Sequence, residues 1–156
     1  MENLRFPALL EPRRPIRAVL VGWAAVTIPA LLLSALVASF LPQAKGPEFG
    51  AVSADLVVRL VVMAPLIETL IMAALLEVMV LALPPRAAVV ISSIGWGLAH
   101  SYIAVAWGLI IWWPFLIFST LYVTWRGQGR MLAIAIVFAV HALNNLGPAL
   151  LLLRSG

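Results

Sequence analysis

Long apolar runs, separated by short polar segments, make up almost the whole chain. A helix that crosses a bilayer needs roughly 20 predominantly apolar residues. On this criterion the runs predict helices over residues 16–41, 54–83, 87–104, 107–125 and 131–153. The stretch 87–125 has no Asp, Glu, Lys or Arg and is too long for one ordinary span. We therefore expect two helices there, joined by a tight turn near residues 101–108.

Composition agrees with this pattern. The chain is 64% hydrophobic and 10% charged, whereas a soluble domain is roughly half apolar and about a quarter charged. The sequence predicts an all-α integral membrane protein, a polytopic bundle of about five transmembrane helices. Residues 1–15 would form a cytoplasmic N-terminal tail and residues 16–156 a single transmembrane helical domain. The first apolar run, residues 18–44, exceeds the roughly 7–15 residues of a signal-peptide core, so we interpret it as an uncleaved span.

The basic residues cluster in the short connecting segments. We attribute the formal net charge of +4 to membrane topology and anionic lipid rather than to a nucleic-acid partner. One side of the predicted bundle would carry Lys45 and Arg154, and the other would carry Arg5, Arg13, Arg14, Arg17, Arg86, Arg126 and Arg130. Because cytoplasmic loops carry the excess of Lys and Arg, we expect a multi-pass protein of the cell membrane with its N-terminus in the cytoplasm.

The sequence contains no cysteine, which excludes disulfides, thiolate metal sites and a cysteine nucleophile. Candidate chemistry lies instead in polar residues inside the apolar runs: Glu68, His100, His141 and Asn145. Such residues are costly in a bilayer and usually face a protein interior or a water-filled cavity. At a rise of about 1.5 Å per residue, they lie roughly 16–25 Å from the cytoplasmic ends of their helices. We therefore expect these four side chains, from three helices, to form one polar constellation.

Glu68 and His100 each have a catalytic and a structural interpretation. Glu68 can act as a general base toward water, or it can hydrogen-bond across helices as a neutral side chain. It follows Pro65, which cannot donate to the carbonyl of Val61 and should kink the helix. His100 can share a water with Glu68 or bind a metal, or it can be an interfacial histidine near a helix end.

His141 and Asn145 are four residues apart and therefore share one face of a helix. An imidazole and a carboxamide side by side can donate hydrogen bonds to a developing oxyanion, although such a pair also serves to join helices. Glu77 lies about half a turn out of phase with Glu68. We expect it to point elsewhere, and either to snorkel toward the cytoplasmic end of its helix or to pair with Arg86.

The small and aromatic residues of this region are interpreted structurally. Gly95 and Gly97 would let another helix approach closely. Trp107, Trp112 and Trp113 are interpreted as interfacial anchors and lipid-facing bulk.

The order and spacing of the polar residues resemble the CPBP family of intramembrane proteases, named for its CAAX-processing and bacteriocin-processing members and also called the Abi family. Its members typically show Glu-Glu-x-x-x-Arg after a proline, then Phe-x-x-x-His, then His-x-x-x-Asn. The resemblance covers residues 64–146. The matching residues are Pro65 and Glu68 in PLIETLIMA, Trp96 (in the phenylalanine position) and His100 in SSIGWGLAH, and His141 and Asn145 in FAVHALNNL.

The resemblance implies a helical, metal-independent glutamate protease that needs no cofactor. Glu68 and His100 would activate the hydrolytic water, while His141 and Asn145 would stabilise the oxyanion formed from a peptide bond. The substrate would be a peptide or membrane protein, lipidated or otherwise membrane-associated, that enters laterally or from the cytoplasmic face.

The chain departs from the family pattern in the first motif, where Thr69 replaces the second glutamate and Ala73 the arginine. Thr69 can still donate a hydrogen bond to a carboxylate, whereas Ala73 cannot replace a guanidinium. The leading hypothesis is an intramembrane endopeptidase, and the alternative is a non-catalytic membrane interaction or immunity protein on the same fold. A third hypothesis, a zinc-dependent hydrolase, would use Glu68, His100 and His141 as ligands.

Overall fold

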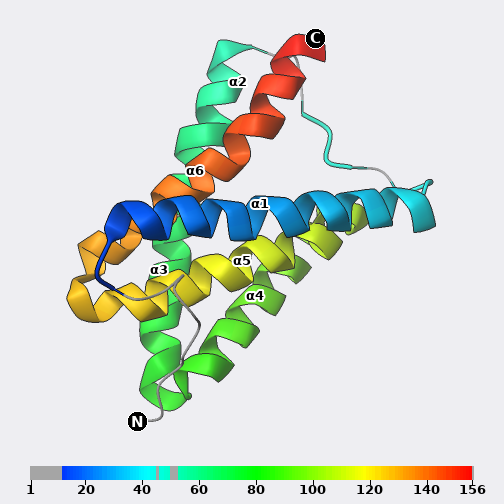
Figure 1. Ribbon diagram of the computed structural model, residues 1–156. Coiled ribbons are helices and arrows are strands. Elements are labelled where there is room, and N and C mark those ends of the chain that lie inside the picture. Colours follow the sequence, from blue (N-terminus) through cyan, green and yellow to red (C-terminus); the bar gives the residue numbers. More distant parts are fainter. Residues whose placement is uncertain (1–11, 45, 50–52, 156) are drawn as a thin grey trace.

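The computed structural model describes residues 12–44, 46–49 and 53–155 (Figure 1). Within these ranges the chain forms only helices and connecting segments, so the predicted all-α fold class is confirmed. The helices α2, η1 (a π-helical segment) and α3 follow one another without a break. The elements are α1 (Pro15–Phe40), α2 (Ala54–Val58), η1 (Arg59–Met63), α3 (Ala64–Ala82), α4 (Pro85–Ser101), α5 (Val105–Trp125), the 3-10 turn η2 (Arg126–Gln128) and α6 (Arg130–Ser155).

The chain is a membrane protein, because helical segments long and apolar enough to cross a bilayer make up most of its described length. These segments are Pro15–Phe40, Ala54–Ala82, Val105–Gln128 and Arg130–Arg154. The remaining helix, α4, has 17 residues, close to the shortest length that spans a bilayer. Residues 1–11 of the predicted N-terminal tail lie outside the described residues. Lys45, in the segment after α1, also lies outside them.

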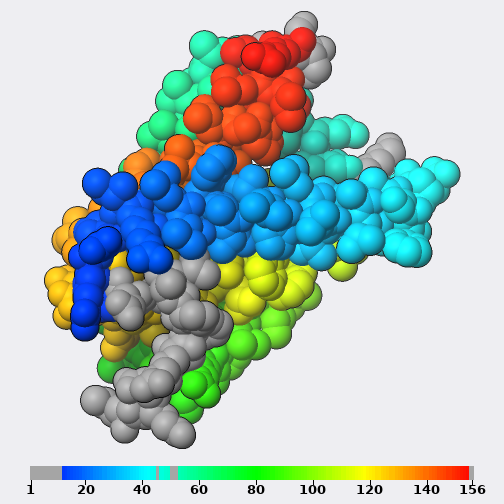
Figure 2. Space-filling model, viewed as in Figure 1, coloured from blue at the N-terminus to red at the C-terminus, as the bar shows by residue number. Residues whose placement is uncertain are grey.

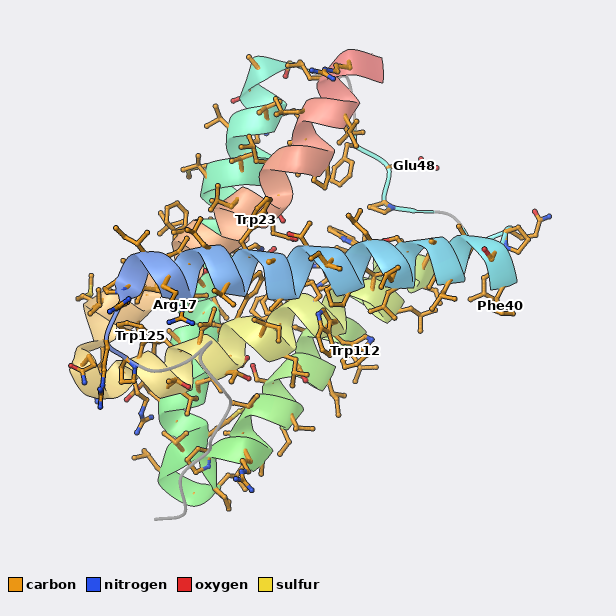
Figure 3. All side chains as sticks on the ribbon, viewed as in Figure 1. Arg17, Trp23, Phe40, Glu48, Trp112 and Trp125 are labelled. Carbon is orange, nitrogen blue, oxygen red and sulfur yellow. The ribbon has the colours of Figure 1, made fainter. Side chains whose placement is uncertain are left out.

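Large apolar side chains cover the outside of α1. Ile16, Trp23 and Phe40 are 78%, 40% and 79% exposed, and Trp23 and Phe40 lie along this helix (Figure 3). Figure 2 shows α1 running uncovered across the visible face of the molecule. Soluble proteins rarely expose so much contiguous apolar surface, so this helix has the surface expected of one that faces lipid.

The core forms around α5, which packs against α1, α3, α4 and α6. In Figure 1, α1, α5 and α4 run side by side, and the α2–α3 helix and α6 cross them. Aromatic side chains of α5 fill the space between these elements. The main buried side chains are Phe115, Phe118, Leu121, Tyr122 and Trp125 of α5, Met72 and Leu76 of α3, and Val137 and Val140 of α6.

A proline inside α1 ties that helix to α5. Pro29 has no backbone N–H and cannot donate to the carbonyl of Ala25, four residues earlier. The indole Nε1 of Trp113 donates a hydrogen bond of 2.9 Å to that carbonyl. Lipid could not supply this donor. Trp113 therefore joins two helices, a role that our interpretation of it as a lipid-facing anchor had missed.

The predicted split of residues 87–125 is confirmed, because α4 ends at Ser101 and α5 begins at Val105. The two helices approach most closely at Gly97 and Gly108. A Cβ on Gly108 would overlap the Ser101 hydroxyl and the Gly97 carbonyl, and a Cβ on Gly97 would lie 2.9 Å from Trp112 Cβ. The expectation of a close helix approach is therefore right for Gly97. It is wrong for Gly95, where a Cβ would meet no described atom within 4 Å.

Glu77 forms a polar cluster with three side chains at the α5–α6 turn. Tyr122 Oη donates to Glu77 Oε1 at 3.0 Å, and Arg126 Nη1 donates to the same oxygen at 3.3 Å. Arg130 pairs with the other carboxylate oxygen, with an Nη2–Oε2 distance of 2.8 Å. Of the two alternatives expected for Glu77, the pairing with Arg86 is therefore wrong. The ion pairs instead tie α3 to the far end of α5 and to the start of α6.

The glycine contact predicts a contrast between two alanine variants. Gly108→Ala should lower the free energy of unfolding by about 1–3 kcal/mol, the usual cost of overpacking, because backbone and hydroxyl atoms occupy the space of its Cβ. Gly95→Ala should not lower it, because open space surrounds that position. Thermal unfolding of both variants in detergent micelles would measure the difference. Equal unfolding temperatures would contradict the close packing of α4 on α5.

Candidate functional site

Three titratable side chains from three helices meet near the middle of the bundle. Glu68 lies one turn into α3, His100 in the last turn of α4 and His141 in α6. The His100 Nε2–Glu68 Oε1 distance is 3.9 Å, and the His141 Nε2–Glu68 Oε2 distance is 3.5 Å. Both imidazoles are buried, whereas the Glu68 side chain keeps 25% of its surface exposed. Each carboxylate oxygen therefore faces one imidazole, and part of the Glu68 side chain remains accessible from outside the bundle.

The backbone of α4 fixes the orientation of His100. Its Nδ1 lies 2.9 Å from the carbonyl oxygen of Trp96, four residues earlier. A carbonyl can only accept a hydrogen bond, so Nδ1 carries the proton and the Nε2 of neutral His100 is an acceptor. This acceptor faces Glu68 Oε1 across 3.9 Å, too far for a direct hydrogen bond. A separation of this kind suits a bridging water molecule.

His141 lies in an aromatic pocket. Its ring packs against Phe118, with ring centroids 4.5 Å apart, and against Phe115 at 5.6 Å. Its Nδ1 is buried and has no hydrogen-bond partner within the described part of the chain. The Glu68 carboxylate lies beside Nε2 and is an acceptor. This environment favours neutral His141 with its proton on Nε2, directed at the carboxylate.

A π turn immediately before Pro65 creates the partner of Asn145. The N–H of Ala64 bonds to the carbonyl of Arg59, five residues earlier. In this register the carbonyl of Leu60 faces Pro65, which has no N–H to give. Asn145 Nδ2 donates to that carbonyl from α6 at 3.0 Å. We had expected Pro65 to act on the Val61 carbonyl of a regular α-helix; the wider turn shifts its effect back by one residue.

Further hydrogen bonds hold the Asn145 amide from its other side. Thr27 of α1 donates to Asn144 Oδ1 at 3.2 Å, and Asn144 Nδ2 donates to Asn145 Oδ1 at 3.4 Å. The side-chain hydrogen bonds of Asn145 thus go to Leu60 and Asn144 rather than to the three titratable residues. The structure brings Glu68, His100 and His141 together, and it fixes Asn145 one helical turn beyond His141.

The two residues that depart from the family pattern are both buried. Thr69 is 1% exposed, and its hydroxyl has no hydrogen-bond partner among the described residues. Ala73 is 3% exposed and belongs to the apolar core. The hydrogen bond that Thr69 was able to offer Glu68 is therefore not formed. The side chains packed around Ala73 are apolar, whereas a guanidinium requires polar or charged partners.

Trp107 is a site residue that sequence reasoning missed. Its ring meets the His100 ring edge to face, with centroids 4.7 Å apart, and it also contacts Phe49 at 6.1 Å. We had interpreted it as an anchor in lipid. The sequence feature that could have identified Trp107 was its position just after the tight turn. This turn folds the start of α5 back over the end of α4.

A cavity of about 280 Å³ opens beside Asn145. α1, η1, α5, α6 and the described segment 46–49 enclose it. Trp107 and Asn145 belong to its wall, but the three titratable residues do not. Its main lining residues are Thr27, Ala30 and Ser34 of α1, Pro47 and Phe49, Leu60, Trp107, Ile110 and Pro114 of α5, and Asn144, Asn145 and Pro148 of α6.

No three or more His, Cys, Asp or Glu side chains in residues 12–44, 46–49 and 53–155 are placed to hold a metal ion. Comparison of the chain with family models, curated proteins and solved structures gave no match.

The π turn predicts a non-additive pair of substitutions. Asn145→Leu should lower the free energy of unfolding by roughly 0.6–2 kcal/mol, the range for hydrogen bonds between membrane helices, because it leaves the Leu60 carbonyl without a donor. Pro65→Ala restores an N–H opposite Leu60. The double variant should therefore lose less stability than the sum of the two single variants. Denaturation of all four proteins in micelles tests this, and strictly additive losses would rule out the shared carbonyl.

Proposed function

We propose that the protein is an intramembrane endopeptidase of the CPBP type. It would hydrolyse a peptide bond of a membrane-associated or lipidated substrate with water activated by Glu68 and His100. The observation that carries the proposal is the Glu68 carboxylate between two imidazoles, at 3.9 Å and 3.5 Å. A carboxylate and an imidazole acceptor on either side of one water are the groups that general-base catalysis requires.

In this mechanism the water lies between Glu68 Oε1 and His100 Nε2. Glu68 takes its proton as the water oxygen attacks the carbonyl carbon of the scissile bond. The N–H of Asn145 that is not donated to Leu60 meets the oxyanion that forms. Once Glu68 has taken up the proton, the N–H of His141 is released from the carboxylate and donates to the oxyanion as well. Glu68 then passes the proton to the leaving nitrogen, and the carbon–nitrogen bond breaks. No metal or other cofactor takes part.

The proposal includes an orientation and a set of partners. The excess of arginine at one end of the bundle supports a multi-pass protein of the cell membrane with its N-terminus in the cytoplasm. Its partners would be membrane lipid and a peptide or membrane-protein substrate, and no nucleic acid.

A second candidate is a non-catalytic membrane interaction or immunity protein. The buried Thr69 and Ala73 favour it, because neither supplies the charged groups of the family motif. In that case the Glu68 cluster would serve to join α3, α4 and α6 rather than to activate water.

The proposal predicts that Glu68 is essential for cleavage. Glu68→Gln should reduce the cleavage rate of a transmembrane or lipidated peptide by about 10²–10⁴-fold, the usual contribution of a general base. Glu48→Gln should leave the rate unchanged, because Glu48 is an exposed carboxylate outside the site (Figure 3). Mass spectrometry of the products gives both rates. Full activity of Glu68→Gln would refute the mechanism; a phenotype that survives this variant without any cleavage would favour the second candidate.

Because Glu68 and His100 activate the water directly, removal of divalent metal should not change the cleavage rate. Purified protein treated with a chelator should cleave as fast as untreated protein, and elemental analysis of the active protein should find no stoichiometric zinc. Loss of activity that added zinc restores would instead support the metal-dependent hydrolase.

A further inference from the structure

The cavity beside Asn145 combines an apolar wall with one strip of polar groups. The strip consists of Thr27, Asn144, Asn145 and the Leu60 carbonyl, joined by successive hydrogen bonds. The hydroxyl of Ser34, which also lines the cavity, already donates to the Ala30 carbonyl at 2.8 Å. Most of the remaining wall is aliphatic, aromatic or proline. Such a cavity suits an apolar group attached to something that hydrogen-bonds at one edge.

The size of the cavity limits what can occupy it. A cavity of about 150 Å³ in another protein is large enough for benzene. At about 280 Å³, this cavity has room for a large aliphatic or aromatic side chain, whereas pockets for drug-sized ligands begin near 300 Å³. A single large side chain is therefore the occupant of matching size.

Asn145 connects the cavity to the Glu68 cluster. Its carboxamide has two N–H groups, and Leu60 accepts from one of them. The other has no acceptor among the described residues, and it can donate to a backbone carbonyl of a chain whose side chain lies in the cavity. Trp107 contacts both the cavity and the Glu68 cluster, because it lines the cavity and its ring also contacts the His100 ring. A peptide held this way has its side chain on one side of Trp107 and its backbone directed toward Glu68.

We infer that this cavity is the pocket for a large apolar side chain of the substrate, next to the bond that is cleaved. The inference rests on the proposed function and names the substrate feature that the site selects. The described segment 46–49, between α1 and α2, contributes Pro47 and Phe49 to the wall of this pocket.

The location of the lining residues gives the direction from which the substrate enters. Most of them come from the middle and second half of α1, the first half of α5 and the second half of α6. The basic turns lie at the opposite ends of these helices, where Glu77 pairs with Arg126 and Arg130. Figure 3 shows the two ends of α1 by Arg17 and Phe40. With a cytoplasmic N-terminus, the pocket opens away from the cytoplasm and not toward the cytoplasmic face, which is one of the two routes of entry that the family resemblance implies.

A pair of phenylalanine substitutions on α1 tests the pocket. Ala30→Phe places a ring in the cavity, whereas Ala35→Phe places one on the exposed surface of the same helix. Cleavage is measured on two peptides that differ by Leu or Ala at the position next to the scissile bond. Wild type and Ala35→Phe should prefer the Leu peptide. Ala30→Phe should lose about 10–200-fold in kcat/KM on the Leu peptide, the usual range for apolar pockets, and keep its rate on the Ala peptide. Equal losses on both peptides would overturn the inference.

A labelling experiment tests the pocket without relying on catalysis. Because the chain has no cysteine, Ser34→Cys and Gln128→Cys each introduce one thiol, in the cavity and at the basic end. A membrane-impermeant maleimide added to intact cells should label Ser34→Cys, and it should label Gln128→Cys only after permeabilisation. The Leu peptide should slow the labelling of Ser34→Cys in purified protein, and the Ala peptide should not.

The two experiments separate the inference from the function on which it rests. Absence of any Glu68-dependent cleavage by wild type, together with selective protection of Ser34→Cys by the Leu peptide, would refute the endopeptidase and support the pocket. Glu68-dependent cleavage without selective protection would support the endopeptidase and refute the pocket. Labelling of Ser34→Cys only in permeabilised cells would refute the stated direction of substrate access.

Discussion

The hydrogen bond from Asn145 to the Leu60 carbonyl links two of the helices that carry the site, α6 and the continuous α2–α3 helix. Inside a membrane, a backbone carbonyl without a donor costs several kcal/mol unless protein or trapped water satisfies it. The π turn and Pro65 leave the Leu60 carbonyl without a backbone donor, and Asn145 of α6 donates a hydrogen bond to it. This bond fixes how far α6 is shifted along the α2–α3 helix. The same register brings His141, one turn earlier on α6, opposite Glu68.

The third helix of the site depends on a different constraint, the absence of side chains at Gly97 and Gly108. Because the backbones of α4 and α5 nearly touch there, the hairpin is tight enough for Trp107 to fold back onto His100. Proline and glycine are poor residues for the interior of a soluble helix. In membranes, neighbouring helices can satisfy the carbonyl that a proline leaves, and small residues allow close approach. Residues that weaken single helices therefore specify how these helices assemble.

The sequence predicted the helices well, since their limits follow from apolar run length and from turn residues such as Pro84 and Gly129. It also anticipated that Glu68, His100 and His141 would lie at similar positions along their helices. The sequence did not predict the features that depend on rotation about a helix axis, such as the direction in which a side chain faces. Counting residues assumes about 3.6 per turn, and the π turn before Pro65 adds one residue, which moved the freed carbonyl from Val61 to Leu60. Similarly, only the packed bundle decides whether Arg86 or the α5–α6 turn reaches Glu77, and whether Trp107 faces lipid or a histidine.

Packing also decides which groups surround Glu68. Thr69 and Ala73, the positions at which the sequence departs from the pattern that it resembles, both face the core. Neither of them contacts the Glu68 carboxylate through a charged group. Instead, His141 lies beside one carboxylate oxygen, and the other oxygen faces His100. On the proposed mechanism, the N–H of neutral His141 therefore holds one carboxylate oxygen, and the other oxygen remains free to accept a proton.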